Sequence, residues 1–157
     1  MYKIYRIVLG AALIASVCLI IGLGSNLVRS KPIPWFYAHA SEVTISGQRI
    51  PFVTIEEAHK WVNDPRAVFI DTREEKDFML GHVPGALFLS PEEKENRFPI
   101  VEPFITHDTK LILYCYGPEC DMAEKISAFL IDFGYSNIVI MKEGYIAWEK
   151  KGLATEK

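Results

Sequence analysis

The sequence is poor in cysteine and carries no excess of positive charge. Three cysteines among 157 residues, Cys18, Cys115 and Cys120, are too few for a disulfide framework. The net charge is −3, so the composition does not suggest nucleic acid, and we expect no such partner. The histidines show no metal-ligand spacing with each other or with the cysteines, so we predict no metal site and no cofactor.

Charged residues are also absent from residues 7–28. A helix of that length measures roughly 33 Å, enough to cross a hydrocarbon core of about 30 Å. The apolar core of a secretory signal peptide is usually shorter, and the only AxA site, at residues 38–40, lies too far beyond it for ordinary cleavage. We therefore predict a short polar tail at 1–6, an uncleaved transmembrane signal anchor at 7–28 and a linker at 29–52.

The orientation of this anchor is weakly specified, because basic residues flank the apolar stretch on both sides. Lys3 and Arg6 precede it, and the free amine at Met1 adds to their charge. A short tail followed by the bulk of the chain is the usual layout of a signal anchor. We therefore expect residues 53–157 to lie outside the cytoplasm, in the periplasm of a single-pass, membrane-anchored protein.

Residues 53–157 alternate between apolar runs typical of strands and amphipathic stretches typical of helices. The sequence predicts strands at 67–70, 87–89, 110–114 and 138–141, and helices at 55–63, 101–106, 122–133 and 144–151. Thr54 and Glu57 have the spacing of a capping box at the first helix. This alternation indicates an α/β domain, with a mainly parallel central sheet covered by helices on both faces.

Two weaker signals concern shorter segments. Residues 43–50 surround Gly47 with residues of strand type and predict a small hairpin. Ser90 followed by Pro91 has the pattern of an N-cap and a first helical residue, so a helix is expected to start there.

The stretch around Cys115 carries the strongest chemical signal. The predicted strand at 110–114 delivers Cys115 into a loop, and a helical pattern begins at Met122. A cysteine in front of a helix amino terminus faces unpaired N–H groups and the positive end of the helix dipole, which favours the reactive thiolate. The alternative is that Cys115 is a small apolar residue that closes the sheet. Its position favours chemistry, because ligands of open α/β sheets bind at the carboxyl ends of strands.

Three stretches resemble the rhodanese-like domain, and together the likeness covers about residues 53–157. They are VFIDTREEKDFMLGHVPGA at 68–86, YCYGPEC at 114–120 and GYSNIVIMKEGYIAWEKKGL at 134–153. The resemblance implies a sulfurtransferase in which Cys115 accepts a sulfane sulfur as a persulfide and passes it to a nucleophile. The implied partners are a small sulfur compound or a protein thiol.

The chemistry of a persulfide agrees with this expectation and predicts roles for the residues around Cys115. Main-chain N–H groups of the loop are expected to cradle the negatively charged persulfide. The residues that can supply them are Tyr116, Gly117, Glu119, Cys120 and Asp121.

The first two matching motifs also contain residues for which we favour a structural role. Asp71 and Arg73 are expected to form a partly buried ion pair, and the alternative is that Arg73 reaches an anionic substrate. His82 lies in the loop that contains Gly81, Pro84 and Gly85, where backbone hydrogen bonds are a better prediction than general-base catalysis.

The loop departs from the commonest family pattern at Cys120, where an arginine usually stands. Glu119 and Asp121 add negative charge, which opposes a low thiolate pKa and repels anions such as thiosulfate. The usual thiosulfate-to-cyanide reaction is therefore in doubt. Without a loop arginine, the phosphatase and arsenate-reductase activities of related folds are disfavoured.

Cys120 has two possible roles of its own. Four intervening residues could bring its Cα within the disulfide range of about 4.4 to 6.8 Å from that of Cys115. Cys120 could then resolve a persulfide or an oxidised form of Cys115, or it could face the core as a small apolar residue. Two other functions stay open, a thiol-disulfide redox protein that uses this pair and a catalytically inactive binding module.

Overall fold

The computed structural model describes residues 2–28 and 41–157, and the chain divides into two compact units, Met1–His39 and Ala40–Lys157. In the first unit, helix α1 (Tyr2–Val28) forms over the apolar stretch. Among the described residues, no helix combines the length and apolarity that a membrane crossing requires. The anchor predicted at 7–28 is therefore not supported, because an uncharged run is sufficient for a helix but does not by itself establish a span.

The periplasmic location of the second unit stays a prediction. Residues 29–40 of the predicted linker lie outside the described residues.

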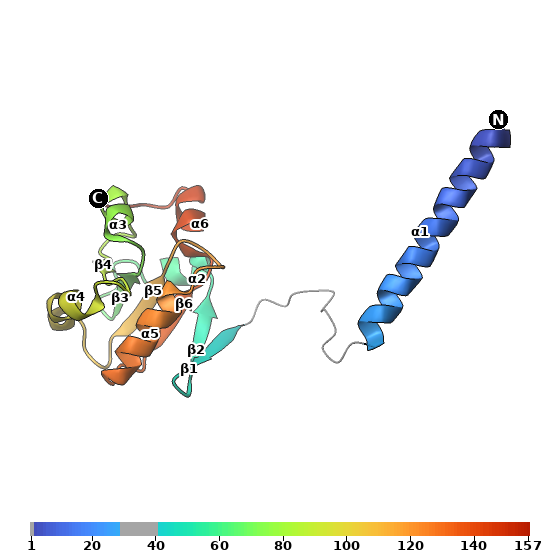
Figure 1. The fold of residues 1–157 in the computed structure, drawn as a ribbon. Coiled ribbons are helices and arrows are strands. Elements are labelled where there is room, and N and C mark those ends of the chain that lie inside the picture. The colour runs from blue at the N-terminus through green and yellow to red at the C-terminus, as the bar shows by residue number, and fades with distance from the viewer. Residues whose placement is uncertain (1, 29–40) are drawn as a thin grey trace. The chain divides into compact units, whose positions relative to one another are not determined.

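The second unit is an α/β domain built around one six-stranded sheet (Figure 1). In chain order its elements are β1 (Glu42–Ile45), β2 (Gln48–Val53), α2 (Ile55–His59), β3 (Ala67–Asp71), α3 (Glu75–Leu80), β4 (Leu87–Phe88), α4 (Lys94–Val101), the 3-10 helix η1 (Glu102–Phe104), β5 (Lys110–Tyr114), α5 (Met122–Asp132), β6 (Ile138–Met141) and α6 (Gly144–Lys150). The strand order is β1-β2-β6-β5-β3-β4. All neighbouring pairs are parallel except β1 with β2, so the sheet is mixed with a parallel centre.

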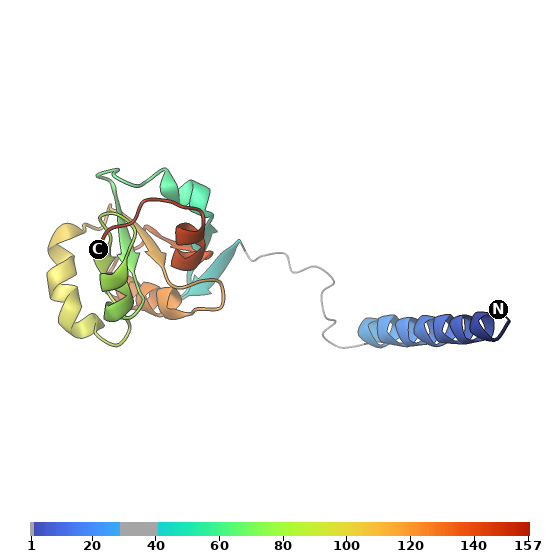
Figure 2. The ribbon, with the colours of Figure 1, turned by 90° about the horizontal axis from the view of Figure 1, so that it is seen from above.

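Helices cover both faces of this sheet, as predicted, and β5 shows why. Leu111, Leu113 and Cys115 point into one apolar cluster, which contains the buried residues of α4 and α5. Ile112 and Tyr114 alternate with them and point into a second cluster, which contains the buried residues of α2 and α6. Figure 2 shows α5 and α2 on opposite sides of the sheet. This period-two alternation is the pattern of a strand that is buried on both faces.

The amino-terminal hairpin is present, and it belongs to the domain. Ser46 and Gly47 both have positive φ, 49° and 80°, as the two-residue turn between twisted strands requires. Because β2 pairs with β6, residues 42–53 extend the sheet, and this part of the predicted linker belongs to the domain.

Three helices differ from the prediction. At 101–106 only the short 3-10 helix η1 forms, after α4 has ended at Val101. The N–H of Glu93 donates to the carbonyl of Ser90 over three residues, which closes a turn, so α4 begins only at Lys94. The capping box of Thr54 and Glu57 is present, but α2 ends at His59 because the chain then tightens into turns. The predicted strands at 110–114 and 138–141 are confirmed.

Candidate functional site

Cys115 lies at the carboxyl edge of the parallel strands, directly after β5 and between the ends of β3 and β6. The loop from Cys115 to Asp121 connects β5 to α5. The topology therefore places this loop where open α/β sheets bind their ligands.

The sulfur atoms of Cys115 and Cys120 are joined in a disulfide, with a Cα–Cα distance of 6.2 Å. Cys115 is only 3% exposed and packs in the apolar cluster on the α5 side, whereas Cys120 is half-buried. The loop thus brings the two predicted cysteines together. In this oxidised state neither sulfur is a thiolate, so any nucleophilic chemistry of Cys115 begins with the reduced protein.

The turn between β6 and α6 holds the cysteine loop by its backbone. The N–H of Tyr145 donates to the carbonyl of Cys115 at 2.7 Å, and the N–H of Ile146 donates to that of Tyr116 at 3.2 Å. Gly144 has φ +74°, and a Cβ placed on it would lie 2.5 Å from both the nitrogen of Gly117 and the carbonyl carbon of Tyr116. Only glycine fits this contact.

The charges and amides of the loop differ from the expected cradle. The N–H of Cys120 donates to the carbonyl of Gly117 at 3.1 Å, so in this state it is not free to bind a persulfide. The carboxylate of Asp121 pairs with Lys125 at 2.9 Å, which offsets part of its charge. Glu119 forms no ion pair within residues 41–157 and keeps the loop acidic.

Asp71 and Arg73 form the predicted ion pair, and it is almost fully buried, with exposed fractions of 0% and 3%. The Arg73 Nη2 donates to Oδ2 of Asp71 at 2.7 Å and to the carbonyl of Gly81 at 2.6 Å. The guanidinium also lies 3.8 Å from the ring centroid of Tyr145. Burial opposes the charged form, but the hydrogen bonds and charge of Asp71 outweigh it and raise the pKa of Arg73. These contacts support the structural reading of the pair.

Tyr114 completes this network, and sequence reasoning missed it. Its hydroxyl donates to Oδ2 of Asp71 at 2.8 Å and accepts the N–H of Val83 at 3.1 Å. Burial, followed by the charge of Asp71, raises its pKa well above 10, so the phenol stays neutral. The last residue of β5 therefore ties β3 to the Gly81–Ala86 loop. A tyrosine at the end of a buried strand, which needs a partner for its hydroxyl, was the available signal.

His82 is held in its loop by backbone contacts, as expected. Its Nδ1 lies 3.0 Å from the carbonyl oxygen of Phe78, and its ring stacks on that of Phe78 with centroids 3.9 Å apart. Its backbone exchanges two hydrogen bonds of 2.9 Å with Glu156, whose carboxylate accepts the N–H of Gly85 at 2.7 Å. Pro84 is half-buried in the same loop. The contribution of Glu156 could not be predicted, because it comes from the carboxyl-terminal segment.

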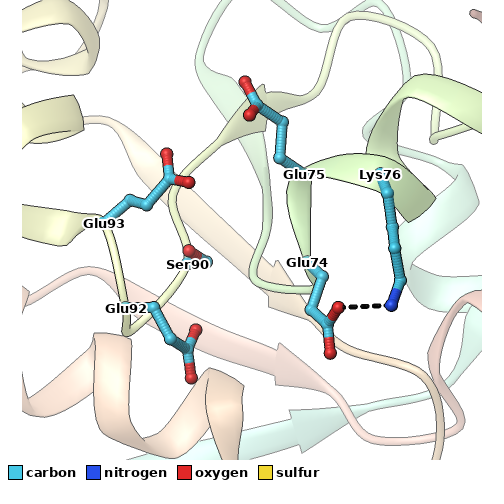
Figure 3. A pocket seen from close by; sticks show the side chains of 6 residues that line it. All are labelled: Glu74, Glu75, Lys76, Ser90, Glu92 and Glu93. Atoms are coloured by element: carbon cyan, nitrogen blue, oxygen red, sulfur yellow. Dashed lines mark ion pairs between the residues drawn. The ribbon is translucent and has the colours of Figure 1, made fainter.

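A pocket of about 330 Å³ opens at the same edge of the sheet, after β3 and β4, and we call it the acidic pocket (Figure 3). Its lining residues are Glu74, Glu75, Lys76, Ser90, Glu92 and Glu93. Across the described ranges, no group of three or more histidine, cysteine or carboxylate side chains is arranged to hold a metal ion.

A model of the Rhodanese-like domain family matches residues 54–151. Two curated relatives are named tRNA uridine(34) hydroxylase. The protein from Sodalis glossinidius is 27% identical over 103 residues, which are 64% of this chain and 28% of that protein. The protein from Yersinia enterocolitica is 23% identical over 103 residues, which are 64% of this chain and 29% of that protein. The chain thus spans less than a third of these relatives. Because their names refer to tRNA, the absence of a nucleic-acid partner stays a prediction.

Solved structures show the same fold at low identity. A protein from Bacillus halodurans superposes with a TM-score of 0.58 at 19% identity, over 67% of this chain and 75% of that one. A rhodanese-related protein from Thermoplasma volcanium gives 0.54 at 17%, over 67% and 96%. A thiosulfate sulfurtransferase from Pseudomonas aeruginosa gives 0.53 at 23%, over 68% and 20%. These similarities establish the α/β fold of this domain. Its activity has to be inferred from the residues of the site.

Proposed function

Because the chain belongs to the rhodanese-like domain family, we propose that it carries sulfane sulfur as a persulfide on Cys115 and that Cys120 resolves this persulfide. The observation that supports the proposal is the Cys115–Cys120 disulfide at the carboxyl end of β5. It means that the loop accommodates direct attack of one sulfur on the other.

The proposed cycle starts from the reduced pair. The Cys115 thiolate attacks the outer sulfur of a sulfane donor, the donor's S–S bond breaks, and the rest of the donor leaves as an anion such as a thiolate. An acceptor thiol can then take the outer sulfur. Otherwise the Cys120 thiolate attacks the inner sulfur of Cys115, the new disulfide forms, and hydrosulfide leaves. Two equivalents of an external thiol reduce this disulfide and restart the cycle.

The charge of the loop favours particular substrates. Glu119 has no cationic partner in residues 41–157, and Arg73 is occupied by Asp71, so the loop offers no free cation to a dianion such as thiosulfate. We therefore propose a donor with a single negative charge, a hydropolysulfide or a protein persulfide, and a small or protein thiol as acceptor. The membrane association predicted for residues 7–28 forms no part of this proposal.

A second candidate, a thiol-disulfide redox protein, is favoured by the same disulfide. In that case the pair exchanges two electrons and two protons with a partner dithiol and never carries an additional sulfur atom. The two functions thus predict different masses for Cys120→Ser, the variant in which the second cysteine cannot release an added sulfur.

Mass spectrometry of the reduced full-length chain distinguishes them. Cys18 is a free, exposed cysteine, so Cys18→Ser serves as the background for every sample. After polysulfide treatment and removal of the reagent, we expect Cys120→Ser to retain one added sulfur atom, because nothing resolves its persulfide. We expect the pair-intact protein to lose two hydrogens and release hydrosulfide, and Cys115→Ser to gain no sulfur.

Three results would contradict sulfur carriage. Oxidation of the pair-intact protein, together with no sulfur gain in Cys120→Ser, supports the redox candidate. An unreactive pair supports an inactive binding module. A sulfur gain of equal size in Cys115→Ser would assign the chemistry to another residue.

A further inference from the structure

The acidic pocket lies beside the cysteine loop at the carboxyl edge of the sheet, and no step of the sulfur cycle uses it. Four of its six lining residues are glutamates, from the start of α3 and from the turn that follows β4 (Figure 3). What this pocket binds therefore depends on how many of its charges are already paired.

Internal ion pairs offset only part of the negative charge. Lys76 pairs with Glu74 at 2.7 Å. Arg97 contacts both Glu75 and, at 3.2 Å, Glu93. Glu92 forms no ion pair with any residue that the structure describes, so four carboxylates face two cations. A positively charged ligand is attracted to such a site, and an anion is repelled.

Ser90 provides an independent indication of a ligand. It is only 2% exposed, yet it lines the pocket. Its hydroxyl forms no hydrogen bond within residues 41–157, whereas every side-chain nitrogen or oxygen sealed from solvent in the described chain has a partner. The hydroxyl must therefore open into the pocket, where Figure 3 shows it between the glutamates. An otherwise buried hydroxyl without a partner is an available acceptor for a ligand N–H.

Tyr116 connects the pocket to the cysteine loop. It follows Cys115 in the chain, and its hydroxyl accepts the N–H of Glu74 at 3.4 Å and donates to Asp77. One tyrosine side chain therefore extends from the reactive loop to the rim of the pocket. A peptide of about three to four extended residues, at roughly 3.3 Å each, is longer than one tyrosine side chain and can therefore reach from the cysteine loop to the pocket.

We propose that the acidic pocket binds the guanidinium or ammonium group of an arginine or lysine on the protein whose cysteine exchanges with the Cys115–Cys120 pair. These groups carry several N–H donors, which the free Glu92 carboxylate and the Ser90 hydroxyl can accept. The volume of about 330 Å³ fits one such side chain. The proposal deepens the proposed function and rests on it for the identity of the exchanging cysteine.

Binding is tested without any sulfur chemistry. The probe is the thiol-free peptide acetyl-Ser-Gly-Gly-Arg-amide, titrated into the oxidised full-length protein, with the glutamate peptide acetyl-Ser-Gly-Gly-Glu-amide as its control. We expect the arginine peptide to shift the amide NMR signals of Ser90 and Glu92, and the glutamate peptide to leave them unchanged. Equal shifts by both peptides, or shifts confined to other surfaces, would overturn the proposal.

Coupling to the cysteines is tested by opening of the disulfide in the Cys18→Ser background. The probes are acetyl-Cys-Gly-Gly-Arg-amide and the same peptide with glutamate in place of arginine. The peptide thiolate attacks one sulfur of the pair, the Cys115–Cys120 bond breaks, and a mixed disulfide forms with release of the other thiolate. We expect the arginine peptide to react about two- to fivefold faster, as for a partly exposed ion pair.

Charge-reversed variants locate the origin of this preference. Glu92 is exposed, and Glu92→Lys is expected to remove the advantage of the arginine peptide. Asp132→Lys makes the same charge change at the exposed carboxyl end of α5 and is expected to keep it. In the unsubstituted pocket, about 0.5 M salt should also reduce the advantage, because screening weakens exposed charge pairs.

The outcomes separate this proposal from the proposed function. Arginine-peptide binding without faster disulfide opening, or an equal loss of preference in Glu92→Lys and Asp132→Lys, would overturn the proposal. Because the binding titration involves no sulfur, it reports on the pocket even if Cys115 takes up no sulfur. Failure of sulfur loading alone would contradict the proposed function and leave the cation site supported.

Discussion

Replacing Gly144 by alanine tests whether the β6–α6 turn holds the cysteine loop in place. The Gly144 backbone has φ +74°, a conformation that costs a residue with a Cβ about 1–2 kcal/mol. The new Cβ would also lie 2.5 Å from the backbone of Tyr116 and Gly117, which cannot move aside as a flexible side-chain end can. The loop must therefore shift.

The shift strains two backbone hydrogen bonds, from Tyr145 to Cys115 and from Ile146 to Tyr116. Each contributes about 0.5–1.5 kcal/mol. Together with the backbone cost, we expect Gly144→Ala to lower the free energy of unfolding by about 2–5 kcal/mol. Urea denaturation of the oxidised full-length protein measures this loss, and amide hydrogen exchange at Tyr145 should become faster.

Gly152→Ala is the matched control, because Gly152 has φ +70° and no atom within 4 Å of an added Cβ. It should cost only the backbone term, about 1–2 kcal/mol. The difference between the two variants therefore isolates the contact with the loop. If Gly144→Ala loses no more stability than Gly152→Ala, and exchange at Tyr145 is unchanged, the turn does not restrain the loop and our reasoning is wrong.

Two further predictions concern the buried network and the disulfide. Tyr114→Phe removes one of the buried donors to Asp71 and the acceptor of the Val83 N–H, and should destabilise the domain by about 1–3 kcal/mol in thermal unfolding. Tyr135 is a buried tyrosine with no hydroxyl hydrogen bond in residues 41–157, so Tyr135→Phe should cost less. Since folding raises the pKa of Tyr114, its contribution is complete below about pH 10 and is lost at higher pH, so stability should fall less steeply above pH 10 in Tyr114→Phe than in the wild type; equal slopes would contradict this. Reduction of the Cys115–Cys120 bond, which closes a short loop, should lower the free energy of unfolding by about 2 kcal/mol, and a reductant that weakens oxidised wild type and Cys120→Ser equally would refute that estimate.

Local patterns in the sequence were sufficient for much of the fold. The aliphatic run of β5 and the apolar periodicity of α5 each depend on neighbouring residues only, and both were predicted within a residue or two. The capping box at Thr54 is equally local. The predicted start of α4 was wrong, because an N-cap pattern at Ser90 also fits the turn that forms there. For α1, the apolar run predicted the helix, but the predicted membrane span was not supported.

The candidate site divides in the same way. Cys115, Asp71 and Arg73 could be identified from short motifs, and the ion pair follows from two residues separated by one position on β3 and its end. The sequence also placed Cys120 near enough for a disulfide, but it left its role open. Only the folded structure joined the two sulfurs and buried Cys115 against α5.

By itself, the sequence determined the order of strands and helices, the position of the cysteine loop and its acidity, because each depends on residue types along a short segment. The tertiary structure alone decided what that loop touches. Gly144 contacts the backbone of Tyr116, and the Ser90 hydroxyl opens into a pocket beside glutamates at the start of α3. The sheet order produces both arrangements, because it places elements side by side that are far apart in the chain. Contacts of this kind depend on how the strands pair, and no local pattern of residues encodes that pairing.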